Sequence, residues 1–216
     1  MKRLLIVILM LSISLSAKDS KKTIGYDKLN LNLSAEELQR ILKTDYSNWS
    51  ISYIDLKPIV IHDPNREGED PEAYYKLSNN SGVSITIYLT EGMTGEVCNI
   101  YVRESFKNTD VLYKQFYSLQ NILTKKYGNP TDTNDNTKGL GFDYDVVTNW
   151  TINTTQFVYI LGSYCEMLTD DGSRRSCHSI EVGYSDDELI QKRTTWIENR
   201  RKEMQTLKYK IDNSKY

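Results

Sequence analysis

The strongest constraint on the fold is a hydrophobic period of two that begins near residue 73. In the segment 83–89, apolar residues alternate with serine, threonine and tyrosine, and the segment 98–102 repeats this alternation. Together with Tyr75 and Leu77, these segments predict a three-stranded antiparallel meander joined by glycine-containing turns. Since neighbouring side chains point to opposite faces, one face of the meander is apolar and the other carries polar and tyrosine side chains.

A second set of strand-like segments occupies the last third of the chain: VVTNWTI at 146–152, TQFVYILGSYCEM at 155–167 and CHSIEVGY at 177–184. We therefore expect an α+β fold with two antiparallel three-stranded meanders, each followed by a helix, with an N-terminal helix and a long C-terminal helix. The halves are 18–108 and 109–216. Their offset is roughly eighty residues, but their sequence identity is negligible, so an internal duplication stays open.

Capping signals and apolar stripes mark the first two helices. Ser34 and Glu37 have the spacing of a capping box, which predicts a helix start at this point. The second helix ends at Gly128 and Pro130, a usual order for a helix C-terminus. Its single apolar stripe consists of Leu112, Phe116, Leu119 and Leu123.

The C-terminal helix is predicted to begin at Ser185, which precedes Glu188 with capping-box spacing. Its first half, through Ile197, is expected to pack on the second meander. Beyond Asn199 basic residues dominate, so the segment 200–216 is expected to be frayed in the free protein.

The segment 163–184 holds two of the three cysteines. A three-residue hairpin loop at 170–172 pairs residues whose numbers sum to 342 and sets Cys165 opposite Cys177, with an apolar inner face. A two-residue turn would shift this register. In an oxidising compartment, opposed cysteines are expected to form a disulfide. Cys98 shares a face with apolar neighbours in its strand and is predicted to be a buried free thiol.

The first 17 residues have the layout of a secretory signal peptide: two basic residues, an apolar run from Leu4 to Leu15, and small residues. The run is shorter than the ~20 residues that span a bilayer, which disfavours the alternative of an uncleaved anchor. We expect a mature chain that starts near Lys18, carries no transmembrane segment, and is periplasmic or secreted.

The charge and motif content exclude several classes of function. The formal net charge is −2, so the chain lacks the basic surface typical of nucleic-acid binding. Cys177 and His178 are strand neighbours that point to opposite faces, which disfavours a Cys–His nucleophile. The cysteines and histidines lack zinc-ligand spacing, and catalytic fingerprints are missing. We predict no cofactor and no metal site.

The segment LYKQFYSLQNILTKKYGNP at 112–130 precedes a Trp-bearing strand and a strand that ends in tyrosine. This order resembles small exported bacterial α+β proteins of unknown function that contain helix-plus-meander units. Their architecture is similar to that of small outer-membrane assembly lipoproteins and β-lactamase inhibitor proteins. The resemblance covers 112–184, and the lipobox cysteine of the lipoproteins is missing. It implies a binding module rather than a catalyst.

The first functional hypothesis is an exported non-catalytic protein-binding module, such as an adaptor, inhibitor or envelope-assembly factor, with an unknown protein partner in the envelope. Tyrosine and tryptophan are enriched at protein interfaces because they bury area at little entropic cost. An alternative role for the tyrosines is to cover the sheet against a loop. The candidate contact residues are Tyr74, Tyr88 and Tyr101 on outer strand faces and Arg200, Arg201 and Lys202 on the C-terminal helix.

The alternative hypothesis is a hydrolase of unrecognised family. It would use acidic residues near His62, namely Asp63, Glu67 or Glu69. A concave pocket with converging acids would favour this hypothesis, and an exposed aromatic patch would favour binding.

Overall fold

The structure is a computed structural model that describes residues 24–55, 73–135, 144–168 and 174–213. The expected signal peptide at 1–17, the acidic segment around His62 and the hairpin loop at 170–172 lie outside these ranges. The elements are β1 (Gly25–Tyr26), β2 (Leu29–Asn30), α2 (Ala35–Asp45), β3 (Ser50–Ile54), β4 (Tyr74–Ser78), β5 (Val83–Glu91), β6 (Thr94–Phe106), α3 (Thr109–Tyr127), β7 (Asp132–Asp135), β8 (Tyr144–Thr151), β9 (Gln156–Leu168), β10 (Arg174–Asp186) and α4 (Asp187–Asn213).

The strands form one eight-stranded antiparallel sheet in the order β3-β4-β5-β6-β10-β9-β8-β7, beside a small two-stranded sheet of β1 and β2. The predicted fold class, with two three-stranded meanders, is therefore wrong. Each meander has four strands, and the two meanders join where β6 pairs with β10, with Val102 opposite Val182. This pairing joins segments far apart in the chain, so local periodicity carries no signal for it.

The order of helices and meanders along the chain is the expected one: a helix precedes the first meander, a second lies between the two, and a third follows the second meander. α2 precedes β3–β6, and α3 precedes β7–β10, so the repeated unit is a helix followed by four strands. The expected boundary at 108/109 falls between the end of β6 at Phe106 and the start of α3 at Thr109. Both units nevertheless share one continuous sheet.

One face of the sheet, here called the α3 face, packs against α2, α3 and the small sheet and contains the main core. The apolar stripe predicted for α3 is confirmed, since all four of its members are buried. They pack with Ile85, Ile100, Ile160 and Trp150 in one cluster. The indole Nε1 of Trp150 donates to the carbonyl of Gly128, which ties the end of α3 to β8 at 3.0 Å.

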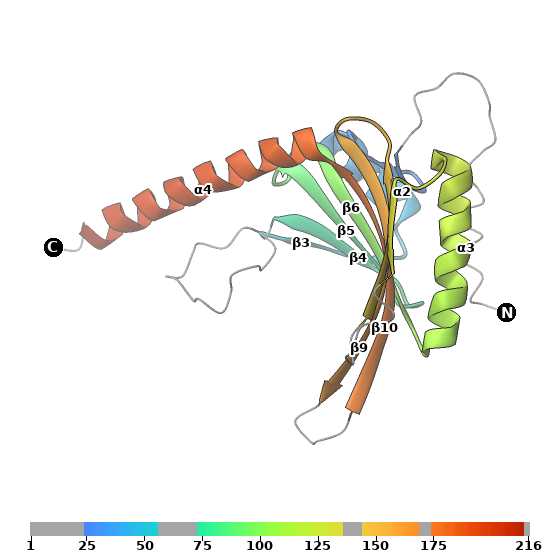
Figure 1. The fold of residues 1–216 in the computed structure, drawn as a ribbon. Helices are drawn as coiled ribbons and strands as arrows, with labels where there is room; N and C mark the ends of the chain where they lie inside the picture. The colour runs from blue at the N-terminus through green and yellow to red at the C-terminus, as the bar shows by residue number, and fades with distance from the viewer. Residues whose placement is uncertain (1–23, 56–72, 136–143, 169–173, 214–216) are drawn as a thin grey trace.

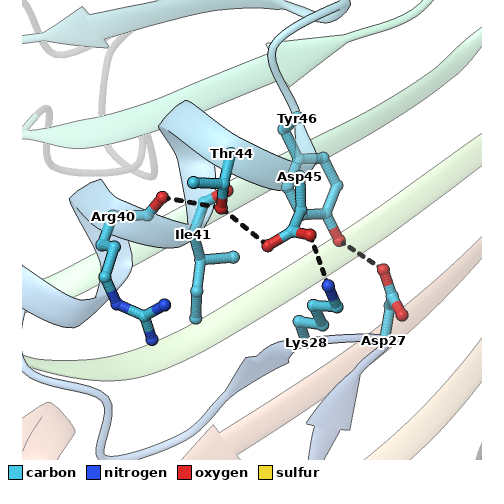
Figure 2. Close-up of polar contacts among 7 residues, drawn as sticks. All are labelled: Asp27, Lys28, Arg40, Ile41, Thr44, Asp45 and Tyr46. Atoms are coloured by element: carbon cyan, nitrogen blue, oxygen red, sulfur yellow. Dashed lines mark hydrogen bonds and ion pairs between the residues drawn. The ribbon is translucent and has the colours of Figure 1, made fainter.

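The capping box that starts α2 is confirmed, because the side chains and backbone N–H groups of Ser34 and Glu37 are hydrogen-bonded to each other. At the other end of α2, two contacts hold the β1–β2 turn (Figure 2). Lys28 forms an ion pair with Asp45, and the hydroxyl of Tyr46 donates to Oδ2 of Asp27 at 3.2 Å. α2 is thus fixed at both ends.

The opposite face, here called the α4 face, is crossed by α4. Figure 1 shows α3 and α4 on opposite sides of the sheet, with the second half of α4 extending beyond it. α4 contacts β5 and β6 and, to a smaller extent, β10. It therefore packs mainly on the first meander, whereas the sequence predicted packing on the second. It is helical through Asn213, which contradicts the fraying expected from residue 200.

The helix cap of α4 also differs from the expected one. β10 runs directly into the helix, and the carboxylate of Asp186 accepts hydrogen bonds from the backbone N–H groups of Glu188 and Leu189. Asp186 is therefore the capping residue, one position after the expected Ser185. Within the described ranges, no helix has the length and apolar character needed to cross a membrane.

Candidate functional site

Four tyrosines form a row across the α4 face of the sheet, one from each of β4, β5, β6 and β9. We call Tyr74, Tyr88, Tyr101 and Tyr159 the tyrosine row. Successive ring centroids are 5.3, 5.6 and 6.3 Å apart, distances typical of favourable aromatic pairs. Tyr74 lies directly opposite Tyr88 in the ladder, so the first contact follows from register alone.

The row crosses β10 because that strand contributes a glycine. Gly183 lies between Tyr101 on β6 and Tyr159 on β9. A Cβ atom at this position would collide with the ring of Tyr159, so the ring covers the glycine and reaches toward Tyr101. The hairpin register expected from the sequence pairs these residues, and that register is confirmed by the ladder, including Cys165 opposite Cys177.

The outer end of the row has a fixed polar network. The hydroxyl of Tyr159 donates to Oε1 of Glu181 at 2.6 Å, and Nε of Arg103 lies 3.9 Å from Oε2 of the same carboxylate. The pKa of Tyr159 is raised well above its ordinary value, mainly by burial and to a smaller extent by the hydrogen bond to Glu181. Tyr159 is therefore a neutral hydrogen-bond donor at physiological pH and is not a candidate general base.

A second polar contact lies beside Tyr101. Nδ2 of Asn99 donates to the hydroxyl of Tyr101 at 3.0 Å. Asn99 is 9% exposed, and its Oδ1 atom is buried without a hydrogen-bond partner. This arrangement fixes the direction of the Tyr101 ring, since an amide buried beside the sheet has little freedom to rotate.

α4 covers the middle of the row. The guanidinium of Arg193 lies 4.8 Å from the ring centroid of Tyr88, and its Nη1 donates to the carbonyl of Leu89 at 2.8 Å. Tyr88 is 6% exposed, so it has little surface available to a partner in this structure. Its outward strand face was assigned correctly, but a helix from the distant C-terminus covers that face.

Cys98 is buried beneath the same helix, with a free thiol. The expected burial is confirmed, but the expected face is wrong. The β5–β6 ladder shifts register between Tyr88 and Leu89, and the resulting bulge turns Cys98 toward Tyr88 and Leu189 on the α4 face. Desolvation raises the pKa of this thiol to about 11, so Cys98 is not an activated nucleophile.

Elsewhere on the α4 face, several aromatic and aliphatic side chains are half-buried. Tyr74 and Tyr101 were predicted from the sequence, whereas the residues on β8 and β9 were not, although they alternate with core residues of the same strands. We call the whole set the open surface: Tyr74, Tyr101, Val147, Phe157, Tyr159 and Leu161.

The three basic candidates lie in the second half of α4, just before Met204, which packs against the cluster of Ala73 and Ile197. Arg200 and Lys202 are exposed, and Arg201 is half-buried with its Nε atom lacking a partner. Nη1 of Arg200 pairs with Glu203 of the same helix at 2.9 Å. These residues belong to the second half of α4, which extends beyond the sheet in Figure 1, whereas the open surface lies on the strands.

The hydrolase candidates His62, Asp63, Glu67 and Glu69 lie outside the described residues. The other histidine, His178, is buried on the α3 face, where Nε2 lies 3.1 Å from Oγ1 of Thr109 and the ring contacts Tyr164. Among the residues that the structure describes, no three His, Cys, Asp or Glu side chains are close enough together to hold a metal ion.

No protein-family model, curated protein or solved structure matches this chain. The resemblance to small exported bacterial proteins therefore stays a prediction. The candidate site rests on its own geometry: a half-buried aromatic and aliphatic surface on the α4 face of the sheet, beside a helix that extends beyond the sheet.

Proposed function

We propose that this chain is an exported, non-catalytic protein-binding module, an adaptor, inhibitor or envelope-assembly factor, and that a folded partner protein contacts the open surface. The observation that carries the proposal is the aromatic and aliphatic set on the α4 face, which is only half-buried beside α4. Export is supported by the layout of residues 1–17.

The open surface has the composition and rigidity of a protein interface. Large aromatic rings bury much area on association and lose little conformational freedom. Here the loss is smaller still, because Tyr101 is held by Asn99, and Tyr159 by Glu181. A surface already fixed in this way loses less entropy on binding than a mobile one.

The charges beside the open surface favour a protein partner over a polyanion. Arg103 is exposed, but Glu181 lies within ion-pair distance of it, so the two charges offset each other. A neutral, aromatic surface recognises shape and apolar area, whereas nucleic-acid sites need several uncompensated cations.

Site-specific photocrosslinking tests the proposal. A benzophenone amino acid is placed at Phe157 or Leu161 on the open surface, and the purified chain is irradiated in an envelope extract. The matched control position is Tyr117, which is 47% exposed on α3 on the opposite side of the sheet. We expect a discrete adduct from the open surface and none from the control, with the attached protein identified by mass spectrometry.

A substitution pair gives the corresponding affinity test with the identified protein. Leu161→Glu should weaken its binding by about tenfold or more, since it puts a charge into an apolar contact, whereas Tyr117→Glu should leave binding unchanged. Equal crosslinking at all positions, or equal binding by both variants, would contradict the proposal.

A further inference from the structure

The two edges of the eight-stranded sheet differ in how they resist pairing with another strand. Edge strands usually carry charges, proline or bulges that prevent such pairing. β7, at one edge, has the sequence DTND and is only four residues long. β3, at the other edge, has the sequence SISYI, with neither a charged residue nor proline. Among the described residues, no strand pairs with the outer edge of β3.

β3 also exposes an apolar side chain. Ile51 is 39% exposed and is one of three large hydrophobic residues exposed to this degree in the described part of the chain. It points to the α3 face, because it lies opposite the buried Leu77 of β4. The free edge thus presents both backbone groups and an apolar contact.

A groove of about 880 Å³ lies between this strand and one flank of α2. Ile51 forms the strand side. The other side consists of residues on α2 and of Ser47, which follows the helix; the helix residues are Glu36, Glu37, Gln39, Arg40, Leu42 and Lys43. From Glu36 to Lys43 the helix flank spans about 10 Å. That length matches about three residues of extended chain, so the groove would hold part of a strand that pairs with the five residues of β3.

The charges of the groove are unequal along its length. The carboxylate of Glu37 is occupied by the capping box, where it accepts from the backbone N–H and the hydroxyl of Ser34. Arg40 and Lys43 form no ion pair with the described residues, because Glu37 is held in the capping box and Asp45 is paired with Lys28. Glu36 and Glu37 lie toward the start of α2, so the half of the groove near the end of the helix is the more basic half.

The helix side of the groove is rigid. The capping box fixes the start of α2, and the contacts of Asp45 and Tyr46 with the β1–β2 turn fix its end (Figure 2). A strand placed between β3 and this helix would meet a preformed wall, which lowers the cost of ordering the complex.

We infer that β3 and α2 form a peptide-binding site in which an extended segment of a partner protein adds to the sheet as a further strand. Backbone hydrogen bonds to the edge of β3 supply the pairing, and side chains on alternate positions supply the selectivity. The preferred segment places an apolar residue against Ile51 and Leu42 and an acidic residue against Arg40 and Lys43. This site is distinct from the open surface, so either can fail without the other.

A second copy of the chain fits the groove less well. Continuing the sheet through a β3–β3 pair would bring a second α2 to the same side, beside the same groove. A single extended peptide, in contrast, brings no second helix to the groove. This alternative is an outcome of the test below.

The test begins with a displayed library of random octapeptides selected on the purified chain. We expect the enriched sequences to have β-branched residues at alternate positions and to contain at least one acidic residue. A labelled enriched peptide is then titrated against two double variants with the same change in charge. Arg40→Glu with Lys43→Glu should weaken binding by about tenfold or more, and Lys114→Glu with Lys125→Glu, on exposed positions of α3, should leave it unchanged.

N-methylation of single peptide amides tests strand addition itself, because only alternate amides of an added strand point toward β3. We expect methylation at alternate positions to abolish binding and methylation at the intervening positions to be tolerated. Absence of enrichment, equal binding by the two double variants, or tolerance of methylation at every position would overturn the inference. So would a dimer in sedimentation that Ile51→Asp dissociates, because it would assign the edge to a second copy.

Discussion

A Cβ atom on Gly183 would lie 2.1 Å from Cε1 of Tyr159, far inside van der Waals contact. The two residues face each other on β10 and β9, and the ring of Tyr159 occupies the space that a side chain at 183 would need. The tyrosine row therefore depends on a residue that contributes no side chain to it.

Gly183→Ala is expected to destabilise the protein by about 1–3 kcal/mol, because the added methyl group displaces the ring of Tyr159. In a Tyr159→Ala background the same change should be neutral or stabilising by up to about 1 kcal/mol, since alanine restricts the unfolded chain more than glycine does. Urea unfolding of the four proteins in this cycle measures the coupling. Equal effects in both backgrounds would show that Gly183 is needed for another reason.

Arg193→Met is expected to cost about 2–3 kcal/mol. Arg193 is 4% exposed, and methionine keeps much of its volume but leaves the carbonyl of Leu89 without its charged donor. The contact with the ring of Tyr88 is also lost. Thermal and urea unfolding provide the measurement.

The neighbouring Lys192 is the control for Arg193. Lys192→Met removes an exposed ion pair with Glu188, 3.6 Å long, and should cost no more than about 0.5 kcal/mol. A similar loss from both substitutions would mean that the guanidinium contacts contribute little beyond surface charge.

The capping box of α2 is expected to make stability depend on acidic pH. Hydrogen bonds from the backbone N–H and side chain of Ser34 lower the pKa of Glu37 below its ordinary 4.5. Because the folded-state pKa is the lower one, the resulting stabilisation is present above pH 4.5 and is lost as pH falls through the folded-state value. Glu37→Gln should therefore flatten the stability profile in this acidic window, measured by urea unfolding from pH 6 to pH 3.

Ser34→Ala tests the other half of the same capping box. It is expected to cost about 1 kcal/mol at neutral pH, since the backbone N–H of Glu37 loses its acceptor. If Glu37→Gln leaves the pH profile of stability unchanged while Ser34→Ala shows the expected loss of stability, the Ser34 side chain stabilises the helix start without help from the Glu37 carboxylate.

Thiol chemistry distinguishes the three cysteines. Cys98 is buried and the pKa of its thiol is raised to about 11, so alkylation at pH 8 should proceed only after unfolding. Peptide mapping of exported protein without reduction should find Cys165 linked to Cys177, the pair that the ladder sets directly opposite. A bridge that includes Cys98 would contradict both expectations.

Local signals predicted the parts of the fold that local interactions determine. The hairpin register that pairs Cys165 with Cys177, the capping box at Ser34 and the stripe of α3 each depend on residues close together in the chain. The edge strand β7 escaped prediction because its sequence, DTND, has no apolar residue, and β3 because its alternation of serine with Ile51 and Tyr53 is very short.

The errors in the candidate site have a common cause, which is contact between distant segments. Tyr88 is buried because α4 crosses β5, and α4 reaches β5 only because β10 pairs with β6. Cys98 lies on the other face than expected because a bulge shifts the alternation by one residue, and this bulge has no sequence signature. Periodicity assigns a residue to a face, but it does not say what covers that face.

β6 and β10 are the last strands of their respective meanders, and they pair antiparallel with Val102 opposite Val182. The two units therefore meet through equivalent edges, as subunits do across the twofold axis of a symmetric homodimer. A single helix-plus-four-strand unit with such an edge already has the geometry to form the whole sheet with a second, unlinked copy. The polypeptide can thus be viewed as a dimer whose subunits have been fused, after which each half was free to acquire its own surface.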